Sequence, residues 1–126
     1  MAKFLTGDDG TIAAVIQEGK AVLESNGKPL EELVSHVSKE EGNEKHVPLV
    51  HEEAGKVYVK VGSLLHPMEP DHYIDWVYLL TDQGSQRKHL HPGQSPEVVF
   101  LIAEDEVVLD VEAHCTRHGL WKADLE

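Results

Sequence analysis

Four histidines and the chain's single cysteine could together bind a transition metal: His46, His66, His72, Cys115 and His118. His66 and His72 bracket the turn "HPMEPDH", and Cys115 and His118 have the C-x-x-H spacing of a metal-binding turn. Neutral imidazole and thiolate are ligands for zinc, copper and iron, whereas magnesium and calcium prefer oxygen. The residue types therefore indicate transition-metal chemistry.

Several other interpretations fit parts of this set. A lone cysteine is more often a small buried hydrophobe, and Cys115 with His118 as base could also be a nucleophile. Structural zinc needs only four ligands, and blue copper uses two histidines, one cysteine and a weak axial ligand. Four nitrogens and one thiolate suit a five-coordinate iron whose sixth position is open for reaction. The other histidines have no comparable context. His36 is left unassigned, and the rest are expected to be surface residues: His51, His89, His91 and His114.

The elements that must position these residues are short strands. Residues 56–62 alternate, with Val57, Val59 and Val61 on one face, and residues 72–81, 97–103 and 106–114 are further strand candidates. In 72–81 the alternation predicts one face made of Ile74, Trp76, Tyr78 and Leu80. Turn signals between the segments favour an antiparallel sandwich, in which the strand ends that carry the five residues can converge.

The first 35 residues or so differ from the rest, being short of strand-forming runs and containing four glycines. Leu30, Leu33, Val34 and Val37 are spaced as in a short helix, although the β-branched residues would also suit a strand. This part is expected to be a small appendage to the sandwich.

Composition limits the function classes. With 11 Lys and Arg against 23 Asp and Glu, the net charge of −12 argues against nucleic acid or an anionic membrane as partner. One cysteine excludes an intramolecular disulfide, and no apolar run has the length of a membrane span or signal peptide. The expected location is the cytoplasm.

Four motifs resemble one known family: "EKHVP" (44–48), "VKVGS" followed by "HPM" (59–68), "HYIDW" (72–76) and "CTRHGLW" (115–121). In this order they are similar to the catalytic domain of superoxide reductases, the desulfoferrodoxin and neelaredoxin group. The resemblance implies an all-β, immunoglobulin-like antiparallel β-sandwich. It also implies one iron ion (Fe2+/Fe3+) per chain, held by His46, His66, His72 and His118 in a plane with Cys115 axial.

The same resemblance assigns two catalytic residues and marks two departures. Glu44 corresponds to the carboxylate that occupies the sixth position of oxidised iron, and Lys45 to the cation beside the open site. Thr116 stands where the family usually has Asn. The family's N-terminal domain binds a second iron through four cysteines, for which this chain has Thr6, Asp9, Ser25 and Asn26.

Two domains are therefore expected. Residues 1–37 would form a degenerate desulforedoxin-like domain without its iron site, and residues 38–126 the iron-binding β-sandwich. The resemblance implies a superoxide reductase that reduces superoxide to hydrogen peroxide in oxidative-stress defence. Rubredoxin or a similar small protein would donate the electron, and the chain would form a homodimer or homotetramer. The alternatives are a metal-binding or electron-transfer module without superoxide turnover, or a structural sandwich with an empty site.

Overall fold

The structure is a computed structural model that describes residues 3–37, 45–62 and 64–125. These residues form strands and no helix, which confirms the predicted all-β class. They also contain no helix long and apolar enough to cross a membrane. The chain divides into two compact units, Met1–Val34 and Ser35–Glu126.

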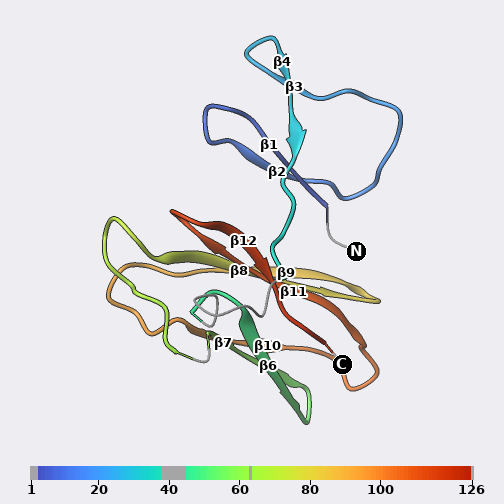
Figure 1. Ribbon diagram of the computed structural model, residues 1–126. Coiled ribbons are helices and arrows are strands. Elements are labelled where there is room, and N and C mark those ends of the chain that lie inside the picture. The colour runs from blue at the N-terminus through green and yellow to red at the C-terminus, as the bar shows by residue number, and fades with distance from the viewer. Residues whose placement is uncertain (1–2, 38–44, 63, 126) are drawn as a thin grey trace. The chain divides into compact units, whose positions relative to one another are not determined.

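The N-terminal unit consists of short strands (Figure 1). Its three-stranded sheet has the order β2-β1-β5, and a two-stranded ribbon pairs β3 with β4. The bounds are β1 Phe4–Thr6, β2 Ile12–Ala14, β3 Glu24–Ser25, β4 Lys28–Pro29 and β5 Glu31–Glu32.

The prediction of a short helix near residues 30–37 is wrong. Leu33 N–H donates to the carbonyl of Phe4 at 2.9 Å, so this stretch continues the pairing of β5 with β1. Val34 and Val37 remain largely exposed, which shows that the apolar residues at helical spacing do not form a buried helix face. Sheet pairing between distant residues has overridden the local pattern.

The second unit is a sandwich of two antiparallel sheets (Figure 1). One has the order β10-β7-β6 and the other β12-β11-β8-β9. The bounds are β6 Pro48–Glu53, β7 Lys56–Val61, β8 Ile74–Thr81, β9 Gly84–His89, β10 Glu97–Leu101, β11 Val108–Cys115 and β12 Gly119–Lys122. Val57, Val59 and Val61 of β7 are buried as predicted, and they pack with Phe100 of β10 in the core between the sheets.

The single face predicted for β8 is wrong, although Ile74 and Trp76 are both buried. The core contains Ile74, Val77 and Leu79, not Tyr78 and Leu80. Cys115 of β11 pairs with Ile74, whereas the preceding residue pairs with Trp76, so the register shifts at this point. Such a bulge changes which residues face inward, and simple alternation cannot foresee it.

Both faces of β11 are covered. Val111, Ala113 and Cys115 belong to the core, while Asp110 and Glu112 are buried on the opposite face. Burial raises the pKa of Glu112 to about 8, and Asp110 beside it adds to the shift. Near this face the backbone of His36 forms a parallel bridge with Trp121 of β12.

Side chains from β9 bond to the edge of β10, which belongs to the other sheet. Gln86 donates to the carbonyl of Leu101 at 2.8 Å, and Lys88 donates to the carbonyl of Val99. The Lys88 ammonium also lies 5.7 Å from the centre of the Phe100 ring. These contacts join the two sheets along one side of the sandwich.

Candidate metal centre

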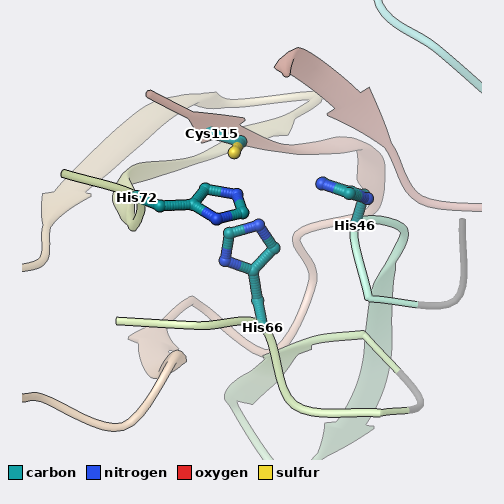
Figure 2. Close-up of side chains that lie close together, drawn as sticks. All are labelled: His46, His66, His72 and Cys115. Carbon is teal, nitrogen blue, oxygen red and sulfur yellow. The ribbon is translucent and has the colours of Figure 1, made fainter. Parts of the chain in front are cut away.

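The metal-binding candidates come from separate ends of the sandwich strands. His46 lies two residues before β6, His66 and His72 lie in the connection between β7 and β8, and Cys115 is the last residue of β11. Figure 2 shows these four side chains gathered around one space. One ligand atom from each of the four lies within 4.8 Å of the others.

His118 joins this group from the turn between β11 and β12. Its Nδ1 lies 3.1 Å from Nε2 of His46 and 3.7 Å from Sγ of Cys115. The His118 and His72 ring centres are 5.0 Å apart. His118 is exposed, whereas His66 and Cys115 are buried, so the group opens to solvent on the His118 side. The structure thus brings four histidines and one cysteine together.

Three nitrogens of this group are buried and have no hydrogen-bond partner among the described residues: Nδ1 of His46 and Nε2 of His66 and His72. The other nitrogen of His66, Nδ1, lies 2.7 Å from the carbonyl oxygen of Pro67. Because a carbonyl only accepts, His66 must carry its proton on Nδ1, and Nε2 keeps its lone pair. A hydrogen bond of this kind commonly orients a metal-binding histidine.

His46, His66 and His72 are held in the neutral form that a metal requires. Burial, with smaller contributions from the neighbouring histidines, lowers the pKa of His46 to about 4. Burial is also the main cause of the lowered pKa values of His66 and His72. Lys45 contributes to both of the latter shifts, so its positive charge acts on this site. At neutral pH these three imidazoles need not lose a proton before they bind a cation.

This donor set fits a non-haem iron. A buried lone pair without a partner is unfavourable unless a proton or a metal occupies it. Imidazole nitrogens and a thiolate exclude a hard cation and suit iron, copper or zinc. Four nitrogens with one sulfur exceed the four ligands of structural zinc. The residues present are therefore suited to a five-coordinate iron.

Trp121 supports two of these histidines, a role that the sequence did not indicate. Its indole stacks on His46 at 4.6 Å between ring centres, and its Nε1–H donates to the carbonyl of His118 at 3.0 Å. His36, left unassigned from the sequence, also contacts Trp121 at 4.6 Å. The sequence shows only that Trp121 follows His118 by three residues. The pairing of β12 with β11 is needed to show that Trp121 contacts these histidines.

The remaining predicted residues differ in what the structure says of them. Lys45 is exposed next to His46, and Glu44 lies outside the described residues. The expectation that His114 is a surface residue is wrong, because only 15% of its side chain is exposed. Its Nδ1 lies 2.7 Å from Asp75 and its ring stacks on Trp76. The individual ligand and catalytic assignments stay predictions.

The comparisons with known proteins agree with this geometry. Residues 38–124 match the family model described as Desulfoferrodoxin. The chain belongs to the desulfoferrodoxin family.

Relatives in this family match most of the chain. A desulfoferrodoxin homolog of Archaeoglobus fulgidus is 42% identical and covers 90% of this chain and 89% of its own. The desulfoferrodoxin of Nitratidesulfovibrio vulgaris is 39% identical, with 91% and 89% covered. Among solved structures, the superoxide reductase from Treponema pallidum is 30% identical, with a TM-score of 0.83 over 98% of both chains. The superoxide reductase from Giardia intestinalis is 26% identical, with a TM-score of 0.55 over 66% of this chain and 98% of its own.

Proposed function

We propose that this protein is a superoxide reductase that uses one iron per chain, held by His46, His66, His72, Cys115 and His118. The observation that carries the proposal is the convergence of four imidazoles and a thiol, in which Nε2 of His66 and Nε2 of His72 are buried with no other partner among the described residues. Membership of the desulfoferrodoxin family and the likeness to superoxide reductases support it. Bound iron would supply the single electron that reduces superoxide to hydrogen peroxide.

The protein's own residues have four tasks in this reaction. His46, His66 and His72 are kept neutral by burial and the thiol lies in the core, so this part of the site is arranged before the metal arrives. Lys45 attracts the superoxide anion, which the net charge of −12 would otherwise repel. Its ammonium, or solvent on the exposed His118 side, supplies protons, since superoxide needs one electron and two protons to become hydrogen peroxide. Glu44 is proposed as the carboxylate that closes the open position after the product leaves.

The proposal extends to partners and location. An external one-electron donor must restore the reduced state, and a small protein such as rubredoxin is proposed for this task. Two or four copies of the chain would form the assembly. The cytoplasm suits Cys115, because a reducing compartment keeps a lone thiol available as a ligand.

The test is to load the protein with ferrous iron and expose it to superoxide. We expect rapid consumption of superoxide, one hydrogen peroxide formed per superoxide, and no dioxygen. After oxidation a thiolate-to-iron absorption band should appear in the visible range, and it should be lost in Cys115→Ser. The control is His89→Ala, which removes an exposed histidine of β9 and should retain both activity and band.

Two outcomes would contradict the proposal. A protein that binds iron with the band but does not consume superoxide would be an electron-transfer module, and a colourless protein that retains zinc would refute the iron site. Lys45→Ala should slow the reaction about tenfold at low salt and less at high salt, within the usual range of electrostatic steering. Lys56→Ala on β7 is the matched control. Equal rates for Lys45→Ala and the native protein would refute the role of Lys45.

A further inference from the structure

The two residues between Cys115 and His118 both bond to the segment that carries His72. Thr116 contacts Tyr73, the residue after His72, and Arg117 contacts Asp71, the residue before it. Cys115 and His118 come from one segment and His72 from another that is more than 40 positions earlier in the sequence. Contacts on both sides of His72 therefore hold the two segments together.

The contact between Thr116 and Tyr73 is reciprocal. Thr116 N–H donates to the carbonyl of Tyr73 at 3.0 Å, and Tyr73 N–H donates to the hydroxyl oxygen of Thr116 at 3.2 Å. In a regular antiparallel pair both acceptors would be backbone carbonyls. Here the side chain takes the place of one carbonyl, just beyond the last pair of β11 and β8, Cys115 with Ile74.

Because the Thr116 hydroxyl replaces a backbone carbonyl as acceptor, β11 can end here while its segment stays bonded to the segment before β8. Since the Thr116 hydroxyl accepts from Tyr73, the Thr116 backbone can turn at once. The chain reverses through Gly119, whose φ of 79° favours glycine, and returns as β12. His118 lies in this turn, so the same hydroxyl that keeps His72 beside Cys115 allows His118 to fold back toward the sulfur.

Arg117 adds a weaker contact on the other side of His72. Its Nε donates to the Asp71 carbonyl and its Nη2 to the Asp71 carboxylate, both at 3.2 Å. Both side chains are more than half exposed, so solvent and salt weaken the pair. Most of the effect is therefore expected from Thr116.

We propose that Thr116 is a positioning residue whose hydroxyl fixes His72 relative to Cys115 and His118 before metal binds, with Arg117 in a smaller supporting role. This inference rests on the proposed function, in which His72, Cys115 and His118 belong to one metal site. It adds a requirement for a side-chain acceptor at position 116, which serine and asparagine would meet and valine would not.

The test compares Thr116→Val with Thr116→Ser and Thr116→Asn in the full-length protein. Valine matches threonine in shape and removes only the hydroxyl. Because Thr116 is exposed, water can satisfy Tyr73 N–H, so folding should survive. We expect Co2+ to bind Thr116→Val about tenfold more weakly, at the lower end of the loss that follows when a group that orients a metal ligand is removed. The cobalt–thiolate band should also shift, and both properties should recover in the Ser and Asn variants.

A second readout needs no metal. In metal-free Thr116→Val, Cys115 should react several-fold faster with a thiol reagent than in the native protein, where it is buried. Thr116→Ala should show the same loss, and Arg117→Leu a smaller one that disappears at high salt. Native Co2+ affinity and native thiol protection in Thr116→Val and Thr116→Ala would overturn the proposal. A native protein that binds Co2+ through Cys115 but, with iron, does not consume superoxide would refute the proposed function alone.

Discussion

The N-terminal unit and the sandwich each bring polar side chains from separate loops together, but they satisfy those side chains differently. In the N-terminal unit, the Asp9 carboxylate accepts from Ser25 at 3.1 Å and from Asn26 at 3.3 Å, and it also accepts from the backbone N–H of Thr11. In the sandwich, nitrogens of three histidines are buried without a partner among the described residues. The hydrogen bonds satisfy the first group, whereas the second has the donor atoms that the proposed metal would use.

The hydrogen-bonded residues of the N-terminal unit stand at positions where the resemblance predicts metal ligands. Asp9, Ser25 and Asn26, with Thr6, stand where the resemblance places four cysteines of an iron site, and the Thr6 hydroxyl donates to the carbonyl of Thr11 at 3.0 Å. Hydrogen bonds thus join the loops that a metal would otherwise join. The interpretation of residues 1–37 as a metal-free desulforedoxin-like domain stays a prediction, and this network supports it.

The two units also differ in how much apolar surface they bury. Among the described residues of the N-terminal unit, Phe4 is the buried large hydrophobe, whereas Ile16, Val22 and Leu23 are exposed. The sandwich has a continuous core across both sheets. A unit of this small size without a metal has little to stabilise it beyond such hydrogen bonds. We therefore expect bound metal to stabilise the sandwich and polar contacts to stabilise the N-terminal unit.

The largest expected effect is a metal-dependent stability confined to the sandwich. At a free Co2+ concentration of a hundred times Kd, the sandwich should gain about 2.7 kcal/mol from binding to the native state alone. Trp76 and Trp121 both lie in the sandwich, so the midpoint of denaturant unfolding followed by tryptophan fluorescence reports on it. Cys115→Ser should lose most of the gain. Amide exchange in residues 3–34 should not change. Slower exchange there on adding metal would show that metal also stabilises the N-terminal unit, against this expectation.

The second-largest effect is on stability at acidic pH, and it can be measured clearly only when the ionisable side chain of Glu112 is replaced. The pKa of His46 is lowered from 6.5 to about 4, so metal-free native protein resists a proton that the unfolded chain accepts. Stability is then complete above about pH 6.5 and falls as the pH drops toward 4. Glu112 acts in the opposite direction, because its pKa is raised from 4.5 to about 8, and its contribution falls as the pH rises through that range.

We therefore expect metal-free Glu112→Gln to be more stable than the native protein at pH 9 and to lose stability steadily between pH 6.5 and 4. Denaturant titrations at several pH values measure both changes. In the N-terminal unit, which has no histidine, hydrogen bonds from Thr11 lower the pKa of Asp9 below 3.8, so its stability should persist to lower pH. A flat profile for Glu112→Gln between pH 6.5 and 4 would show that the histidines are not protected from protons.

The smallest effect is expected from Asp9→Ala. This change removes the acceptor for Ser25, Asn26 and Thr11 and should destabilise the N-terminal unit only slightly, because these hydrogen bonds are exposed to water. Faster amide exchange near residues 11 and 25–30 would show it. Asp8→Ala, which loses an exposed ion pair with Lys28, is the control and should change exchange less. Unaltered exchange in Asp9→Ala would mean that the network does not hold the loops.

The sequence predicted what depends on residue type and order. The sandwich class followed from alternation and turns, and the convergence of His46, His66, His72, Cys115 and His118 followed from their places at strand ends. What it could not predict depends on register between distant strands. The bulge beside Ile74, the stacking of Trp121 on His46 and the bond from Tyr73 to Thr116 each need two segments to be aligned within one residue.

The bonds from Gln86 and Lys88 to β10 bear on self-association. An edge strand whose carbonyls face solvent can pair with a strand of another molecule and begin a fibre. Here the carbonyls of Val99 and Leu101 already have partners, and a charged ammonium stands at the edge. An incoming strand would have to displace both side chains, so this side of the sandwich is protected against aggregation by residues that have no part in the metal chemistry.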